Sequence, residues 1–234
     1  MGDIRSWYEM TLAQIASDSY LDDININVRS GALEKRLRLG ANHYDHETDN
    51  NASGNLSATR MTPTMIDDFI KTWKIIDHQE NTDSGFSATL MQHKTNDQYT
   101  LSFRSTESKQ SSDGGDVERD SSNGANVQIK DLGFAYGQLR DMEKYYQELK
   151  EQGHLPTGTG LNIIGYSLGG HLAQVFTRLH YDDVIHTYTM NGAGFGDFDG
   201  ASSGGAYGQG VLARLNKIEV VKANRGLPPV EEAA

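Results

Sequence analysis

The 234-residue chain carries a formal net charge of −11 and contains no cysteine. Its length suits one α/β domain with a sizeable core, so we expect residues 1–234 to form a single domain. The negative charge argues against nucleic-acid partners and against an electrostatic hold on anionic lipid surfaces, because both need clustered Lys and Arg. Without cysteine there is neither a disulfide framework nor a thiolate metal site.

Localisation is left open by the sequence. No apolar run approaches membrane-spanning length, and the start lacks the basic and apolar regions of a signal peptide. An acidic chain without cysteine is compatible with a secreted, extracellular protein but does not establish one. If the protein is exported, we expect its signal to lie elsewhere.

The first part of the chain shows helical patterns followed by strand patterns. A short helix is expected around residues 7–17, and the polar stretch 42–59 is expected to be a surface loop. Thr62 and Pro63 have the character of an N-cap and a first helical residue. The helix that they begin has an apolar face formed by Met65, Ile66, Phe69, Ile70 and Trp73. Strands are predicted at 73–76, 86–92 and 98–103, the last two as an antiparallel pair joined by a turn at 95–97.

The rest of the chain alternates strands and helices. A polar stretch over 107–126 precedes a helix predicted over 134–150, and strands at 161–164 and 184–190 flank another helix. The pattern continues with a glycine-rich loop at 191–210, a short helix at 211–215 and a strand at 217–221. This alternation predicts an α/β fold with a mostly parallel sheet and helices on both faces.

A serine-centred turn stands between the strand at 161–164 and the helix that follows it. Its sequence is Gly165-Tyr166-Ser167-Leu168-Gly169. A nucleophile elbow needs small residues two positions before and after the serine, because its backbone is strained and the helix packs close to the strand. The order of strand, turn and helix favours Ser167 as a nucleophile. The alternative is a glycine-rich turn whose serine caps the helix.

A second segment, Arg104-Ser105-Thr106, ends a predicted strand. Together with the serine-centred turn it resembles the class 3 (fungal-type) lipases and related bacterial lipase-like domains. The resemblance covers roughly residues 73–199 and implies an α/β-hydrolase-like fold. In that family an Arg-Gly-Ser/Thr turn supplies a donor of the oxyanion hole, which carries this role onto Thr106, with the N–H of Leu168 as the partner donor. Ser105 departs from the family glycine, and the alternative is an ordinary polar strand end.

The family pattern fails towards the end of the chain. The family places its acid in a loop after the strand beyond Gly194 and its histidine later still, whereas no histidine follows His186 here. The residues at 223–226, where the acid is expected, include no carboxylate. Either the chain is the front part of a longer lipase, with a C-terminally incomplete fold, or it is a degenerate fold without hydrolytic activity. We expect the first, because the serine-centred turn is retained.

The catalytic histidine is unknown at this stage. Partners of Ser167 should come from loops that follow strands, because ligands bind at the carboxyl ends of strands in open α/β sheets. This argument places three histidines toward the opposite edge of the sheet: His154, His180 and His186. A packing role is expected for His171, whereas the loop that carries His43 and His46 could reach anywhere.

Candidates for the acid and for metal binding come from polar loops. Asp197 and Asp199 follow the strand at 184–190 and are therefore at the correct edge for the acid of a triad. Acyl-serine chemistry needs no cofactor, and no metal site is expected. The carboxylates around His43 and His46 are interpreted as a solvated loop rather than a metal cluster. A structural calcium ion is the less favoured interpretation of the acidic run that contains Asp113, Asp116 and Asp120.

The function predicted from these residues and from the resemblance is a serine carboxylic-ester hydrolase. It would act on lipid acyl esters, as a triacylglycerol lipase or a phospholipase A does, through an acyl-enzyme on Ser167. The alternative from another class is a catalytically incomplete, hydrolase-like module that binds a lipid or a partner. A third hypothesis is an acyltransferase or a thioesterase that uses the same acyl-serine chemistry.

Overall fold

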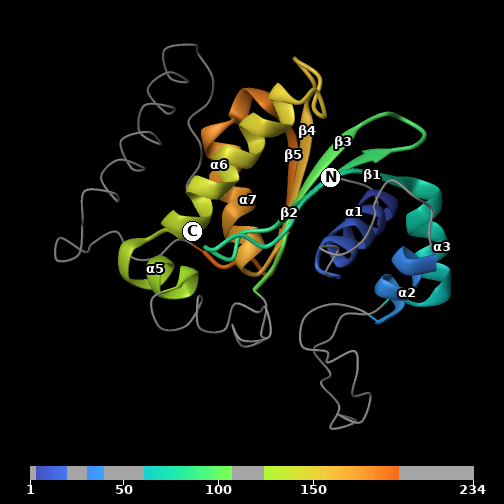
Figure 1. Ribbon diagram of the computed structural model, residues 1–234, viewed down its shortest axis with the longest axis horizontal. Helices are drawn as coiled ribbons and strands as arrows, with labels where there is room; N and C mark the ends of the chain where they lie inside the picture. Colours follow the sequence, from blue (N-terminus) through green and yellow to red (C-terminus); the bar gives the residue numbers. More distant parts are fainter. Residues whose placement is uncertain (1–3, 20–30, 40–60, 107–123, 195–234) are drawn as a thin grey trace, which may run out of the picture.

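The computed structural model describes residues 4–19, 31–39, 61–106 and 124–194, and these form one sheet with helices on both faces (Figure 1). The strands are β1 (Trp73–Gln79), β2 (Ala88–His93), β3 (Tyr99–Phe103), β4 (Leu161–Tyr166) and β5 (Val184–Met190). The α-helices are α1 (Ile4–Ser17), α2 (Gly31–Leu39), α3 (Pro63–Thr72), α5 (Ala125–Leu132), α6 (Tyr136–Glu151) and α7 (Leu168–Leu179), and a 3-10 helix, η2, spans Tyr181–Asp183.

The described strands lie in the order β1-β2-β3-β4-β5. Strand β2 is antiparallel to both β1 and β3, whereas β3, β4 and β5 are parallel to one another. The sheet is therefore mixed, and its antiparallel part contains the hairpin that the sequence predicts. The α/β class, with helices on both faces and an α/β-hydrolase-like arrangement of strand, turn and helix, is confirmed.

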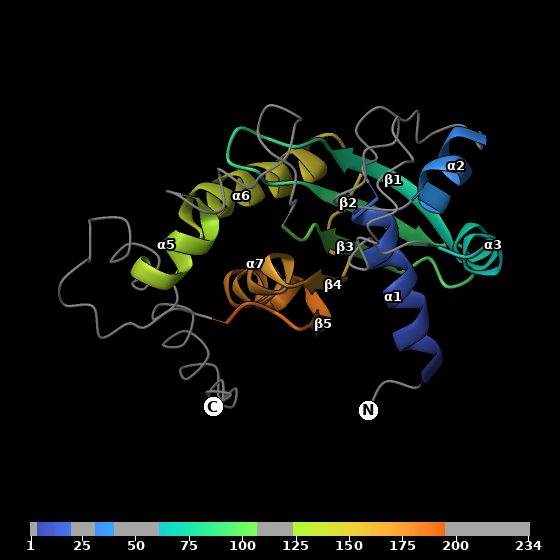
Figure 2. The same cartoon turned by 90° about the horizontal axis from the view of Figure 1, so that it is seen from below.

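Each face of the sheet carries its own helices. Figures 1 and 2 show α5, α6 and α7 on one side and α1, α2 and α3 on the other. Alternation along β3 explains this division: Leu101 and Phe103 enter the core under α6 and α7, whereas Thr100 and Ser102 contact α1. The core on the α1 side is completed by Trp73 and other apolar residues of α1, α3 and β1.

Local sequence signals account for the start of α3. The Thr62 hydroxyl accepts a hydrogen bond from the Met65 N–H at 3.3 Å, and Pro63 occupies the first turn, where a missing N–H costs nothing. The helix ends at Thr72, and Trp73 has the extended backbone of β1. The predicted apolar helix face is thus real, except that Trp73 belongs to the strand.

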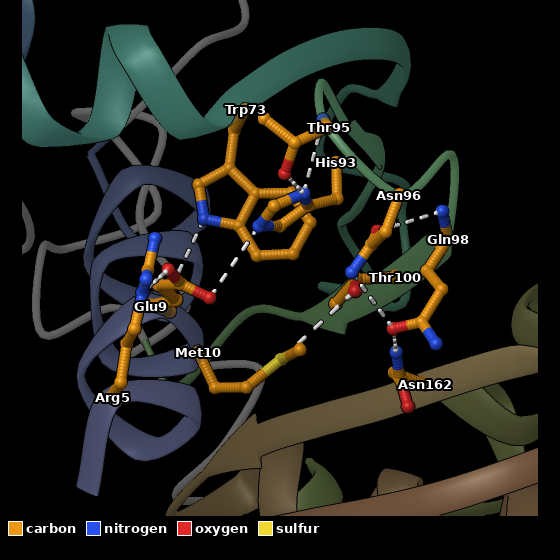
Figure 3. Close-up of polar contacts among 10 residues, drawn as sticks. All are labelled: Arg5, Glu9, Met10, Trp73, His93, Thr95, Asn96, Gln98, Thr100 and Asn162. Atoms are coloured by element: carbon orange, nitrogen blue, oxygen red, sulfur yellow. Dashed lines mark hydrogen bonds and ion pairs between the residues drawn. The ribbon is translucent and has the colours of Figure 1, made fainter.

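Helix α1 runs along β3 from the amino edge of the parallel strands towards their carboxyl edge. Near the amino edge, the Trp73 indole N–H donates to the Glu9 carbonyl at 3.0 Å, and the Glu9 carboxylate lies 3.4 Å from His93 Nε2 (Figure 3). The Thr100 hydroxyl donates to Met10 Sδ at 3.9 Å, as the same figure shows. The middle of α1 is therefore bonded to the sheet near the amino edge, and the C-terminal end of the helix lies at the carboxyl edge.

Two described helices were not anticipated from the sequence. Helix α5 begins at the end of the polar stretch 107–126, and neither there nor at α2 was a helix predicted. Both are short, and their Asn, Gln, Lys and Arg content weakens the apolar periodicity. The predicted loop at 42–59 and the predicted elements at 211–215 and 217–221 lie outside the described residues.

Candidate active site

Ser167 lies in the turn between β4 and α7 and has an unusual backbone conformation. Its φ is 51° and its ψ is −117°. A residue with a Cβ adopts this region only when its surroundings impose it, and such strain gathers at functional sites. The Ser167 side chain is partly exposed, whereas the following Leu168 is buried. The turn therefore presents a hydroxyl at the carboxyl edge of the parallel strands.

Glycines allow the close packing that imposes this conformation. A Cβ on Gly165 would lie 1.9 Å from the carbonyl oxygen of Gly169, so helix and strand touch through their main chains. A Cβ on Gly169 would lie 2.3 Å from the Phe103 carbonyl oxygen, and one on Gly170 would lie 2.5 Å from the Gly192 Cα. The first turn of α7 is thus packed against β4, the end of β3 and the segment after β5.

Main-chain hydrogen bonds hold the same turn from the β5 side. The Ser167 N–H donates to the Met190 carbonyl at 3.1 Å, and the Ala193 N–H donates to the Ser167 carbonyl at 2.7 Å. Asn191, between these two partners, has a φ of 42°, a left-handed conformation that Asn tolerates better than most residues. The peptide groups on both sides of Ser167 are therefore fixed independently of any side chain.

The two expected oxyanion-hole residues, Leu168 and Thr106, belong to the start of α7 and to the segment after β3. Leu168 is the first residue of α7, where main-chain N–H groups have no acceptor within the helix. Thr106 follows the end of β3, and the carbonyls of Phe103 and Arg104 would both be within 3.0 Å of a Cβ on Gly169. The end of β3 and the start of α7 therefore adjoin, as a shared oxyanion hole requires.

Ser105, which stands in place of the family glycine, needs no left-handed backbone. Among the described residues the non-glycine positions with positive φ are Asp97, Ser167 and Asn191. The Cβ of Ser105 therefore meets no left-handed backbone strain in this turn. The Ser105 N–H instead donates to the buried Asp18 carboxylate of the α1 end at 2.8 Å.

His171 is buried one helical turn beyond Ser167 and is occupied by main-chain partners. Its Nε2 faces the Ala135 N–H at 3.4 Å, and its Nδ1 lies 3.0 Å from the Gly194 carbonyl oxygen. Because the first partner only donates and the second only accepts, the proton resides on Nδ1. Burial lowers the pKa of His171 to about 4, against the opposing effect of the Gly194 bond. This neutral, fully hydrogen-bonded ring has the packing role that the sequence predicts.

The other described histidines have partners away from Ser167. His180 Nε2 lies 2.6 Å from a Glu143 carboxylate oxygen, and His154 Nδ1 lies 3.2 Å from Asp77. The remaining described histidines are His78, which hydrogen-bonds to Thr89, His93, which faces Glu9, and His186, exposed early in β5. The position of His186 opposite Asn162 puts it near the start of β4, far from the end that carries Ser167.

The expected acids and metal donors fall outside the part of the chain that the structure describes. This applies to Asp197 and Asp199, to the residues around His43 and His46, and to Asp113, Asp116 and Asp120. Within the described ranges, no group of three or more His, Asp or Glu side chains could hold a metal ion. No described helix is long and apolar enough to cross a membrane.

Residues of α1 were not recognised from the sequence as neighbours of the site. Gln14, Ser17 and Asp18 are buried where α1 meets the end of β3. Their spacing of three and four residues puts them on one side of a helix, and buried polar residues in such a pattern signal a hydrogen-bonded contact. The spacing of these polar residues is visible in the sequence, but the sequence alone does not show which strand their side chains contact.

No family model matches the chain, and no curated protein matches it in sequence. Similar solved structures are lipases. Lipase II from Rhizopus niveus is 13% identical with a TM-score of 0.44, over 97% of this chain and 71% of that one. A lipase from Rhizopus microsporus var. chinensis is 13% identical with a TM-score of 0.43, over 91% and 64%. The Rhizomucor miehei lipase propeptide complex is 11% identical with a TM-score of 0.43, over 97% and 60%.

Proposed function

We propose that the protein is a serine hydrolase of lipid acyl esters and that Ser167 is its nucleophile. The single observation that carries this proposal is the backbone of Ser167, held at φ 51° between β4 and α7 by glycines and main-chain hydrogen bonds. A fold maintains such strain where a side chain must be presented in one direction. The ester and lipid substrate class rests on the sequence resemblance of the two turns.

The reaction proposed for this site passes through an acyl-enzyme. Ser167 Oγ attacks the carbonyl carbon of the ester and transfers its proton to a base, and the carbonyl oxygen becomes an oxyanion. The N–H groups of Thr106 and Leu168 stabilise that oxyanion. The proton then returns to the leaving alcohol, and water releases the fatty acid from Ser167 by the same steps.

We look for the base among residues outside the described ranges. Both ring nitrogens of His171 face main-chain groups, and the other described histidines lie with partners elsewhere. His43 and His46 are the histidines of the sequence that remain. We therefore assign the base to one of these two or to a segment that a longer form of the protein would supply.

A fluorophosphonate probe tests the nucleophile without presuming a substrate. We expect a covalent adduct that mass spectrometry maps to Ser167 and that Ser167→Ala abolishes. Ser84→Ala is the matched control, because the Ser84 hydroxyl donates to Asp141 at 2.6 Å and has no part in the proposed chemistry. Loss of the adduct in His43→Ala or His46→Ala alone would identify the base. An adduct on another serine, with Ser167 unmodified, would contradict the proposal.

Binding without hydrolysis is a second candidate function. It is favoured by one observation: among the described histidines, His78, His93, His154, His171 and His180 are bonded to other groups than the Ser167 hydroxyl, and His186 lies near the start of β5. A folded chain that binds phospholipid vesicles, takes up no probe and releases no fatty acid would support this function instead. Transfer of the acyl group to an added alcohol or release from a thioester would indicate the acyltransferase or thioesterase alternative.

A further inference from the structure

The last turn of α1 forms a polar contact with the end of β3. Gln14 Nε2 donates to the Phe103 carbonyl at 3.0 Å, while its Oε1 accepts from the Ser102 hydroxyl at 3.2 Å. The Ser17 hydroxyl donates to the Ser102 carbonyl at 3.4 Å. The Ser102 hydroxyl, the Ser102 carbonyl and the Phe103 carbonyl are thus all hydrogen-bonded to one face of α1.

Asp18 extends this contact past the strand to the proposed oxyanion turn. One carboxylate oxygen accepts the Ser105 N–H at 2.8 Å, and the other accepts from Gln14 Nε2 at 3.2 Å. The Ser105 hydroxyl is also bonded to this carboxylate. The exposed fractions of Asp18 and Ser105 are 6% and 7%, so water competes little for these bonds. The Arg104–Ser105 peptide, one residue before the Thr106 N–H, is therefore held by Asp18 at the end of α1.

Opposing effects act on the pKa of Asp18 in this environment. Burial raises its pKa to about 6, against the lowering effects of the Ser105 and Gln14 hydrogen bonds and of the Arg104 charge. Arg104, only 3% exposed, is the charged group acting on it from β3. From β2, Thr89 contacts Ser17 and also His78, which brings one more titratable side chain to this face. Asp18 is thus ionised at neutral pH and takes up a proton within a moderately acidic range.

We propose that Asp18 is a positioning residue for the Ser167 site, because its carboxylate holds the Ser105 peptide and so fixes where the Thr106 N–H meets the oxyanion. The inference rests on the proposed function, because the turn at Ser105 has a catalytic role only if Ser167 is the nucleophile. The Phe103 carbonyl shows how directly this works. Gln14 donates a hydrogen bond to it, and Gly169 of the helix that follows Ser167 packs close to it.

The test compares Asp18→Ala, Asp18→Asn and the matched control Asp141→Asn in the 234-residue chain. Asp141 is a partly buried carboxylate that accepts hydrogen bonds from the hydroxyls of Thr82 and Ser84. Unlike Asp18, it lies on α6. We expect Asp18→Ala to slow fluorophosphonate labelling of Ser167 by about tenfold to a hundredfold, because displacement of one oxyanion donor costs this much. Asp18→Asn keeps an acceptor for the Ser105 N–H but loses the charge, as protonation of Asp18 does, so at pH 8 it should label more slowly than the unmodified chain and faster than Asp18→Ala. Asp141→Asn should label as the unmodified chain does.

Two further readouts separate positioning from a merely structural role. With a soluble short-chain ester, Asp18→Ala should lower kcat and leave KM nearly unchanged, because the defect concerns the transition state. The unmodified chain should label more slowly as the pH falls through about 6, when Asp18 is protonated, and Asp18→Asn should lack this component of the profile.

Hydrogen exchange of the peptide that covers residues 103–106 tests the anchor independently of catalysis. It should accelerate in Asp18→Ala and stay unchanged in Asp141→Asn, with circular dichroism confirming that both variants fold. If the unmodified chain takes up no probe, the proposed function fails for this chain, and the exchange result still decides the anchor. Equal labelling and equal exchange in Asp18→Ala and the unmodified chain would overturn the inference. Should Asp18→Ala not fold, the same comparison is made with Asp18→Asn, whose flat pH profile is then the deciding result.

Discussion

Two turns meet at the carboxyl edge of the parallel strands, and they are held in different ways. The turn at Ser167 is fixed by main chain packed on main chain, through Gly165 and Gly169. The turn at Ser105 is fixed by side chains of α1, with Asp18 and Gln14 as the principal partners. The contacts that fix the first turn are made by main chain, with the titratable His171 buried behind them, whereas the second turn is held directly by a buried carboxylate. We therefore expect the two turns to respond differently to substitution and to pH.

The largest effect is expected at the Ser167 turn. Gly165→Ala would place a Cβ 1.9 Å from the Gly169 carbonyl oxygen, and no side-chain rotation relieves a contact with the main chain. We expect a loss of about 3 kcal/mol or more in the free energy of unfolding, measured by urea denaturation. Gly194→Ala, where a Cβ would meet nothing within 4 Å, is the matched control. Similar stability of the two variants would show that the helix and strand are not in contact there.

The buried histidine behind the Ser167 turn should make the protein acid-sensitive. His171 has a pKa of about 4 in the folded protein against an ordinary value of 6.5, so acid protonates the unfolded chain first. Between pH 7 and 5 this lowers the free energy of unfolding by about 2 kcal/mol. His171→Gln should remove that component from urea denaturation curves recorded across the range. His186→Gln, at an exposed histidine, is the matched control, and an unchanged dependence in His171→Gln would contradict the prediction.

A smaller loss is expected when α1 releases the end of β3. Gln14→Leu keeps the volume but removes the partners of the Ser102 hydroxyl and the Phe103 carbonyl, both buried. We expect about 1–2 kcal/mol of destabilisation by thermal or urea unfolding, together with slower labelling of Ser167. Thr11→Ala, which loses only a bond within α1 to the Trp7 carbonyl, is the control on the same helix. Faster or unaltered labelling in Gln14→Leu would argue against a link between α1 and the site.

The smallest expected effect on stability comes from Asp18. Acid changes the free energy of unfolding through Asp18 in the opposite direction to its effect through His171. The pKa of Asp18 is raised from 3.8 to about 6, so the folded protein takes up this proton before the unfolded chain does. Between pH 7 and 5 the unmodified chain should gain about 1 kcal/mol relative to Asp18→Asn in the free energy of unfolding. Asp67→Asn, at an exposed carboxylate of α3, is the matched control. A constant difference between the Asp18→Asn and unmodified curves would refute the assignment of a raised pKa.

Acidification should therefore act on the two turns in contrasting ways. It destabilises the protein through His171 and stabilises it through Asp18, yet we expect the protonated Asp18 to hold the turn at Ser105 less well. Stability and labelling rate of the same samples would separate these contributions. The comparison shows how a site can combine one turn that tolerates no side chain with another whose geometry depends on a titratable group.

The sequence by itself determined the order of the elements and the character of the serine-centred turn. Periodicity predicts β4, α7 and β5 correctly, and the small residues at 165 and 169 predict a close approach of helix and strand. These signals are local, because a turn that needs glycine needs it whatever else surrounds it. The weaker periodicity of α2 and α5 explains why both were missed.

Only the tertiary structure decided which side chains surround the turns. Asp18 and Ser105 are separated by 87 positions, and no pattern within either segment indicates their hydrogen bond. The same is true of His171, whose ring contacts Ala135 and Gly194 from separate segments. Burial and partner identity arise from packing α1, α7 and the sheet together, and it is burial that moves the pKa values of Asp18 and His171 in opposite directions. Local propensities fix the elements, whereas the electrostatics of the site exist only once those elements exclude water from it.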